Sequence, residues 1–230
     1  MVEGLPAMRV LGIETSAAAR GTVALAEGGV RLAEASHEVR SAHAELMLPL
    51  IARLLAEAGW ARGSLDRLAV GVGPGSFTGV RVGIALAQGI ALGLGVPVVG
   101  VPSLAAMARA APPHVSGLRV PLLDARRGEV FAAAYDEHGV ERLAARALPR
   151  ATALAELDGL VGPARVLLGA VAVELAGPAS SLRSPETDLP HAALTALLGG
   201  ELEPGAHPPE PLYVRDAGAT RPVLRPSPLG

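Results

Sequence analysis

The sequence contains no cysteine, no lysine and no asparagine among its 230 residues. The absence of cysteine excludes disulfides, thiolate metal sites and cysteine nucleophiles. The absence of lysine excludes a Schiff-base lysine and the lysine of a phosphate-binding P-loop. All 20 basic residues are therefore arginine. A GC-rich genome explains this arginine-rich, amide-poor composition, although a thermophilic source would give a similar one.

Aromatic residues are also scarce, and the charge is nearly balanced. Five aromatic residues are present, and the formal net charge is −2 with no basic run. A protein that holds nucleic acid by itself usually carries a basic surface or several exposed rings. We therefore expect any contact with RNA to be indirect, through a partner protein.

Half of the residues are apolar, which is enough for a sizeable core. Gly, Arg or Pro interrupts the apolar stretches every few residues, so they do not resemble the roughly 18 apolar residues of a membrane-spanning helix. Residues 1–7 lack the basic start and apolar segment of a secretory signal. We expect a globular, cytoplasmic protein with no membrane association.

The first hundred residues predict three strands followed by alternating helices and strands. The helix after the third strand is expected to begin at a Ser41 cap and to end at Gly59. Pro49 within it predicts a kink or a later start. The other elements expected in this half are strands at 9–14, 22–26, 30–39, 68–72 and 96–101, a loop at 73–79 and a helix at 80–94.

From residue 119 a similar order begins again, which indicates an internal duplication. The elements expected in this half are strands at 119–124, 129–135, 140–148 and 165–168, helices at 151–157 and 191–198, a loop at 199–211 and a last short strand at 212–215. Two such lobes predict an α/β, two-lobed actin-like (ASKHA) fold with duplicated βββαβα lobes. We place the first lobe at residues 8–103, a smaller second lobe at 104–215 and a loose tail at 216–230.

Two equivalent turns of this predicted fold could clamp a nucleotide. An acidic side chain there would orient Mg²⁺ through water, and arginines would bind phosphate. The alternative is that the duplicated hairpins kept their turns after losing a ligand. The candidate residues are Glu14, Thr15 and Ser16 in the first turn and Asp124, Arg126 and Gly128 in the second.

The segment 71–81 is rich in glycine and precedes a predicted helix, a place that can bind phosphate. Its glycine spacing fits neither the dinucleotide-binding motif nor a P-loop, so a tight turn with Thr78 capping the helix is the simpler interpretation. Ser76 resembles a nucleophile elbow, but Pro74 and Thr78 stand where the elbow needs glycine. A serine hydrolase is therefore weakly supported.

Histidine does not form a metal-binding pattern in this sequence. His43 and Glu45 lie on a predicted helix, but no second histidine follows four residues after His43. A polar first turn of an exposed helix is the preferred interpretation.

The two predicted helices of the first lobe carry apolar ridges. Small residues also recur at four-residue spacing on the second helix, which permits close helix approach. We hypothesise that the two helices form an association surface. Its residues are Leu48, Ile51 and Leu55 on the first helix and Gly79, Val82, Gly83, Leu86 and Ile90 on the second.

Several motifs, in order along the chain, resemble the signatures of the bacterial TsaB family. The most specific of them is the string Gly73–Arg81. The others are the segments Leu11–Ser16, His43–Pro49, Gly100–Leu104, Asp124–Val130 and Glu210–Arg215. The resemblance extends from Met8 to about Arg215, so residues 1–7 would be an upstream extension.

This resemblance implies an actin-like fold without catalysis of its own. It implies a homodimer when the chain is alone, a heterodimer with the related catalytic subunit TsaD, and an ATPase, TsaE, that joins the pair. The complex transfers a threonylcarbamoyl group to the adenosine next to the anticodon of tRNA, and the chain would touch tRNA through the complex alone. No cofactor of its own is implied, although ATP or ADP with Mg²⁺ could lie at an interface shared with TsaD.

The segment Pro102–Ala108 separates this chain from the catalytic relatives. In TsaD the equivalent segment carries a metal-binding H-x-x-x-H pair, whereas no histidine occurs here. The sequence therefore resembles the scaffold, and the same lack argues against a metallopeptidase. The alternative function is a small-molecule kinase or ATPase of the actin-like fold, which the two turns support and the missing lysine weakens.

Overall fold

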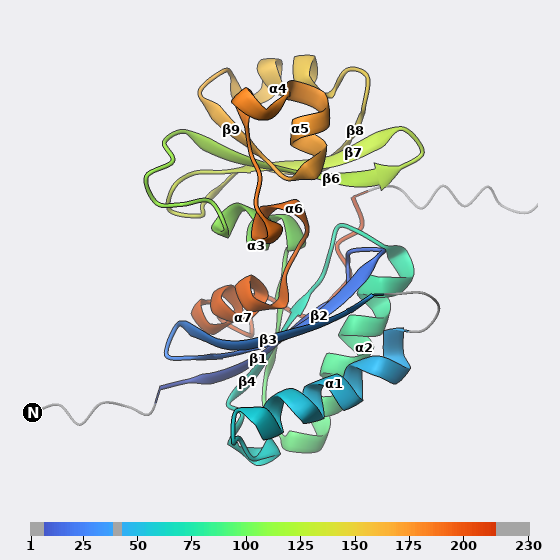
Figure 1. The fold of residues 1–230 in the computed structure, drawn as a ribbon, viewed down its shortest axis with the longest axis vertical. Coiled ribbons are helices and arrows are strands. Elements are labelled where there is room, and N and C mark those ends of the chain that lie inside the picture. The colour runs from blue at the N-terminus through green and yellow to red at the C-terminus, as the bar shows by residue number, and fades with distance from the viewer. Residues whose placement is uncertain (1–6, 39–42, 215–230) are drawn as a thin grey trace, which may run out of the picture.

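The computed structural model describes residues 7–38 and 43–214, which form two lobes stacked along the long axis of the molecule (Figure 1). The expected Ser41 cap and the expected tail at 216–230 lie outside the described residues. So do the side chains of His43 and Glu45.

The first lobe is built on a five-stranded sheet in the order β3-β2-β1-β4-β5. β2 pairs antiparallel with β1 and β3, whereas β4 pairs parallel with β1 and β5. The strands are β1 (Arg9–Glu14), β2 (Arg20–Glu27), β3 (Val30–Glu38), β4 (Arg67–Gly71) and β5 (Val98–Val101). A short 3₁₀ turn, η1 (Arg62–Ser64), precedes β4.

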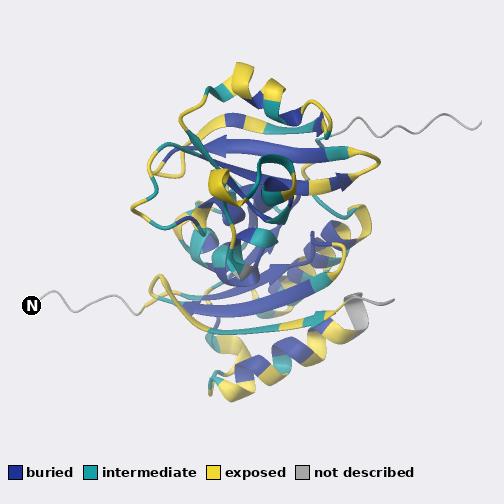
Figure 2. Ribbon diagram, turned by 45° about the horizontal axis from the view of Figure 1, so that its top comes forward, coloured by how far each residue is buried: buried dark blue, intermediate teal, exposed yellow. Residues whose placement is uncertain are grey.

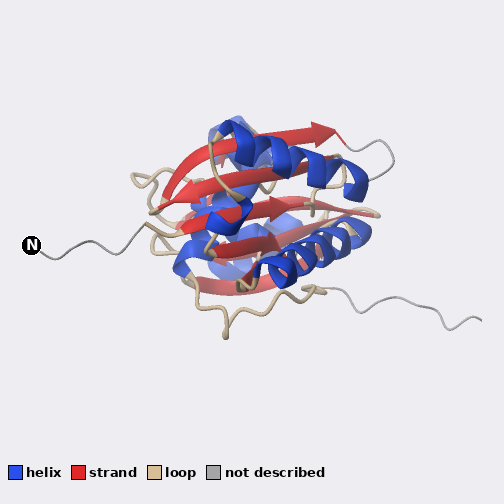
Figure 3. Cartoon of the chain, turned by 90° about the horizontal axis from the view of Figure 1, so that it is seen from below, coloured by secondary structure: helices blue, strands red, loops and turns tan. Residues whose placement is uncertain are grey.

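Helices cover both faces of this sheet. α1 (His43–Glu57) and α2 (Phe77–Leu94) lie side by side on one face, as Figure 3 shows from below. α7 (Ala192–Glu201) packs on the other face against β1, β2 and β4. α7 therefore packs on the first sheet although it follows the second lobe in sequence. The lobe boundaries given above stay a prediction.

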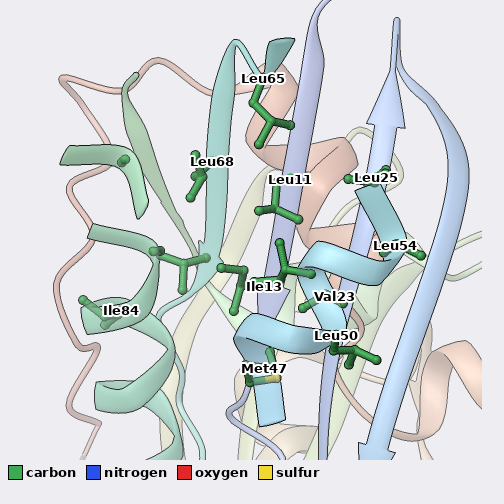
Figure 4. Packing of buried hydrophobic residues seen from close by; sticks show 14 of the residues in the cluster. Leu11, Ile13, Val23, Leu25, Met47, Leu50, Leu54, Leu65, Leu68 and Ile84 are labelled. Carbon is green, nitrogen blue, oxygen red and sulfur yellow. The ribbon is translucent and has the colours of Figure 1, made fainter. Parts of the chain in front are cut away.

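The alternation of β1 explains this sandwich. Leu11 and Ile13 are fully buried towards α1 and α2, in the core that Figure 4 shows. Val10 and Gly12 face α7 instead. Gly12 has no room for a side chain, because a Cβ atom would overlap the carbonyl oxygen of Ala192. Successive strand residues point to opposite faces, so one strand serves both helical layers.

The second lobe repeats the topology of the first. Its five-stranded sheet has the order β10-β9-β6-β7-β8, so that β6 takes the place of β1. This repeat confirms the predicted two-lobed α/β fold with duplicated lobes. The strands are β6 (Leu118–Arg126), β7 (Glu129–Tyr135), β8 (Glu141–Pro149), β9 (Arg165–Leu168) and β10 (Ser181–Leu182).

Helices of the second lobe lie on its outer and inner sides. α4 (Ala153–Val161) and α5 (Ala170–Ala176) pack on the outer face, where Figure 2 shows their exposed surfaces. α3 (Ser103–Arg109) packs on the inner face, and α6 (Pro185–Asp188) contacts it between the lobes (Figure 1). A 3₁₀ turn, η2 (Pro178–Ser180), follows α5.

Some predicted elements differ from the structure. The sequence pattern missed α3, α5, α6 and β10, which are two to seven residues long and too short to show a period. Of the two alternatives expected at Pro49, the later start of α1 is wrong, since the helix runs from His43 through Pro49. The kink stays a prediction. Pro49 has no N–H to donate within the helix, and it lies on the exposed side of α1. No strand forms at 212–214, although the Leu212 N–H donates to the Val72 carbonyl at 2.8 Å.

His191, the residue before α7, holds the start of that helix against the first lobe. Its Nδ1 lies 2.9 Å from Glu34 Oε1, and its Nε2 lies 2.6 Å from an Arg20 guanidinium nitrogen. Burial raises the pKa of Glu34, but the hydrogen bond and charge of His191, together with Arg31, lower it overall. β2, β3 and the start of α7 are thereby joined.

α2 is long and apolar enough to cross a membrane, if length and composition alone are considered. In the structure it packs on β4, β1 and β5 and against α1. The core helix of a globular protein meets the same criterion, and in the described ranges 7–38 and 43–214 α2 is the one helix that does. It is weak evidence for a membrane span.

Candidate functional site

A cavity of about 610 Å³ opens between the two lobes. Both turns that the sequence marked as candidates reach it, because the two lobes repeat one topology and face each other. The lining comprises Ser16–Ala19 after β1, Pro74–Phe77 and Val80 at the start of α2, Leu123–Arg127 in the β6–β7 turn, Phe131, Leu189 and the segment Pro211–Val214.

Three of the six predicted clamp residues, Ser16, Asp124 and Arg126, line this cavity. The carboxylate of Asp124 accepts a hydrogen bond from the Arg126 N–H at 3.0 Å. It also lies 3.6 Å from the Arg126 guanidinium and 3.9 Å from that of Arg150. Asp124 is therefore engaged by basic groups of its own chain. Gly128 shapes the turn with a φ of 77° and does not line the cavity.

Glu14 lies under the cleft, buried within the chain. Its carboxylate accepts hydrogen bonds from the Ser16 N–H at 2.8 Å and from the Ser103 hydroxyl at 3.1 Å. The Thr195 hydroxyl lies 3.4 Å away on α7. Burial raises the pKa of Glu14, and these hydrogen bonds partly offset the rise. Its observed role is to join β1, α3 and α7.

Thr15 is fully buried against α2. Its hydroxyl donates to the Gly79 carbonyl at 2.8 Å. A Cβ atom at Gly79 would overlap the Thr15 carbonyl oxygen, and one at Gly83 would overlap the Thr15 hydroxyl oxygen. The small residues of α2 therefore leave room for the turn after β1 to pack against the helix. This internal packing explains their four-residue spacing without a partner protein.

The loop before α2 is closed by its own hydrogen bonds. Ser76, not Thr78, is the N-cap, since its hydroxyl accepts from the Gly79 N–H at 3.2 Å. The Ser76 N–H donates to the Ser16 carbonyl at 2.7 Å. The Ser76 hydroxyl therefore has a structural role as the helix cap. The N–H groups of Ser76 and Gly79 are engaged within the loop, so they are not free to bind a phosphate.

A second cavity, of about 520 Å³, lies between α1 and α2. Leu48, Ile51, Leu55 and Ile90 of the predicted association surface line it. Arg62 is the one charged residue among its lining. We call this cavity the helix groove. Val82 and Leu86 are half-buried and lie outside its lining, and Gly79 and Gly83 are buried.

Metal ligands do not gather in the part of the chain that the structure describes, where no group of three His, Asp or Glu side chains could hold an ion. The sequence interpretation missed Ser103 and Thr195, because hydroxyls distant in sequence gave no pattern. It also missed the cluster of Phe77, Arg81 and Tyr213 at the cleft. The scarcity of aromatic residues was the available signal for that cluster.

Two lobes of one topology that face each other across a cleft define an actin-like fold. Component A of (R)-2-hydroxyglutaryl-CoA dehydratase from Acidaminococcus fermentans shares this fold, with a TM-score of 0.58 at 12% identity over 84% of this chain and 98% of that chain. YeaZ from Pseudomonas aeruginosa matches more closely, with a TM-score of 0.69 at 29% identity over 90% of this chain and 99% of that one.

The sequence comparisons define the family. Residues 17–185 match the family model described as TsaD, tRNA N6-adenosine threonylcarbamoyltransferase. The chain belongs to this family. Within it, the chain resembles the tRNA threonylcarbamoyladenosine biosynthesis protein TsaB of Escherichia coli K12, with 42% identity over 136 residues. That match covers 58% of each protein, so the chain spans little more than half the length of this curated relative.

Proposed function

We propose that this chain is a non-catalytic scaffold subunit in tRNA threonylcarbamoyladenosine biosynthesis. In this proposal it binds a TsaD-like catalytic protein, a TsaE-like ATPase joins the pair, and the complex acts on the adenosine next to the anticodon. The names of the relatives support the pathway. The helix groove is the observation that supports the scaffold role.

The groove combines a hollow shape with exposed apolar side chains. Leu48 lies at the edge of the groove and is 52% exposed. Ile90 on α2 lines the same groove and is half-buried. Apolar residues that are grouped, exposed and arranged around a hollow mark protein interaction sites. The groove fits an apolar helix face of a second copy of the chain or of the TsaD-like partner.

The chain's own sequence supports assigning the chemistry to the partner. Residues 103–109 form α3 and contain no histidine, so the position of the metal-binding pair expected in TsaD is occupied by a packed apolar helix. None of the six histidines of the sequence lies four residues from another. The kinase or ATPase alternative rests on Ser16, Asp124 and Arg126 in the cleft, and the engagement of Asp124 by arginines weakens it. A nucleotide with Mg²⁺ at a shared interface stays a proposal.

Leu48→Glu is expected to weaken association with the TsaD-like partner by at least about tenfold, because a carboxylate would be desolvated in an apolar contact. The substitution should leave the fold intact, since Leu48 is exposed. Light scattering after size-exclusion chromatography, on the chain alone and mixed with its cognate partner, measures the effect.

Leu160→Glu provides the matched control, because Leu160 is 45% exposed on α4 in the other lobe. It should associate as the wild type does. If Leu48→Glu binds normally while the isolated chain binds and hydrolyses ATP, the scaffold proposal is wrong and the ATPase is favoured.

A further inference from the structure

Arg81 contacts the aromatic rings of Phe77 and Tyr213 at the rim of the cleft. The rings of Phe77 and Tyr213 have centroids 6.0 Å apart. The Arg81 guanidinium lies 3.6 Å from the Phe77 centroid. It donates to the Tyr213 hydroxyl from Nε at 3.0 Å and from Nη2 at 2.8 Å. These contacts hold the guanidinium in one orientation, and the two rings are tilted by 37° to each other. The three side chains form a preformed aromatic and cationic surface, here called the stacking cluster.

The two rings of the stacking cluster are more exposed than the other three aromatic rings of the chain. Phe131 and Tyr135 are buried, and Trp60 is half-buried. Phe77 and Tyr213 are 56% and 54% exposed, so the two most exposed rings of the chain lie together. Aromatic and arginine side chains dominate recognition sites, which distinguishes this cluster from isolated exposed apolar residues.

The second lobe contributes cations to the same cavity. Arg126 and Arg127 line it and are both exposed. Their φ angles are 63° and 55°, in the left-handed region that asparagine or glycine adopts more readily. A tight hairpin turn requires such angles, so the β6–β7 turn places both arginines at its tip. Arg127 forms no ion pair with any residue in the described ranges, whereas Arg126 lies near Asp124.

The exposed ring faces of Phe77 and Tyr213 and the cationic Arg127 line one cavity, and this combination suits a nucleotide. Bases stack on aromatic rings and on guanidinium planes, and arginine binds phosphate. Two N–H groups at the start of α2 already have partners, since that of Ser76 donates to the Ser16 carbonyl and that of Gly79 to the Ser76 hydroxyl. This disfavours a deep cradle for a triphosphate. A single phosphodiester at the exposed rim needs no such cradle.

We propose that the cleft binds an unpaired nucleotide of an RNA strand, with its base on the stacking cluster and its phosphate against Arg126 and Arg127. This inference rests on the proposed function, because it assigns part of the contact with tRNA to this chain. It departs from the expectation that tRNA is touched through the partner alone. A net charge of −2 makes the contact weak and strongly dependent on salt.

The decisive variant is Arg127→Gly. Glycine relaxes the backbone at a φ of 55°, so thermal stability should stay the same or rise. The affinity of the isolated chain for a fluorescein-labelled single strand of ten adenosines, in low salt, should fall about fivefold with loss of the phosphate contact. Tyr213→Ala should reduce it about tenfold through loss of stacking.

Arg53→Gln is the control for charge, because Arg53 is exposed on α1 far from the cavity lining. It should bind the RNA as the wild type does. Three outcomes would overturn the proposal: no saturable RNA binding, equal losses in the Arg53 and Arg127 variants, or tight binding of free AMP or ATP without RNA binding. Leu48→Glu should retain RNA binding and Arg127→Gly should retain the partner, so failure of one proposal can be told from failure of the other.

Discussion

Glu14→Ala is expected to lower the free energy of unfolding by about 3–5 kcal/mol. The carboxylate accepts from the Ser16 N–H and the Ser103 hydroxyl, at 2.8 and 3.1 Å, within a fully buried region. Alanine would leave these donors without an acceptor and would open a cavity where β1, α3 and α7 meet. Urea unfolding followed by circular dichroism measures the loss. A change within about 1 kcal/mol would show that water replaces the carboxylate.

The same residue predicts a pH dependence. Burial raises the pKa of Glu14 above its usual 4.5, so the native state binds this proton more tightly than the unfolded chain. The stabilisation is fully present below the unfolded pKa and is lost as pH rises through the folded pKa. Glu14→Gln has no such proton, so the stability of the wild type should fall relative to this variant as the pH rises above the usual 4.5. A wild type that gains stability relative to Glu14→Gln over this range would contradict the assignment.

Gly79→Ala is the second substitution with a large expected effect, a loss of about 3 kcal/mol. The added Cβ would overlap the Thr15 carbonyl oxygen, which is backbone and cannot rotate away, so α2 would have to move off the sheet. The melting temperature and the urea midpoint both report the loss.

Gly89→Ala in the same helix is the matched comparison. A Cβ there meets nothing within 4 Å, so alanine should stabilise the helix by about 0.5–1 kcal/mol. Equal effects at the two positions would mean that helix propensity, rather than contact with Thr15, decides the role of Gly79.

The sequence predicted the architecture because the order of strands, the positions of the turns and the strand lengths repeat in both halves. The apolar strand at 9–14, the turn after it and the hairpin that follows recur in the same order from residue 119, and this repeat is visible without coordinates. The short α3 could not be predicted in the same way, since Ser103–Arg109 is alanine-rich and spans about two turns. Its place between the lobes is set by tertiary packing.

The candidate site was predicted only in part, for two physical reasons. Glu14 and Thr15 were identified by position, but a residue beside a cleft can point away from it, and contacts with Ser103 and Gly79 decided their orientation. The spacing of Gly79 and Gly83 showed that something approaches α2 closely, but not that it is the turn after β1. The stacking cluster depends on Tyr213, which only the fold brings to Phe77.

The position of α7 has a consequence for how the protein is made. On the ribosome, the strands of the first sheet are synthesised before any of the second lobe, but the helix that covers one of their faces is residues 192–201. Val10, Ala69 and Val99, which pack around α7, remain uncovered in the nascent chain until that helix emerges. Synthesis of the second lobe therefore precedes completion of the first, so the first sheet gains its second helical layer last.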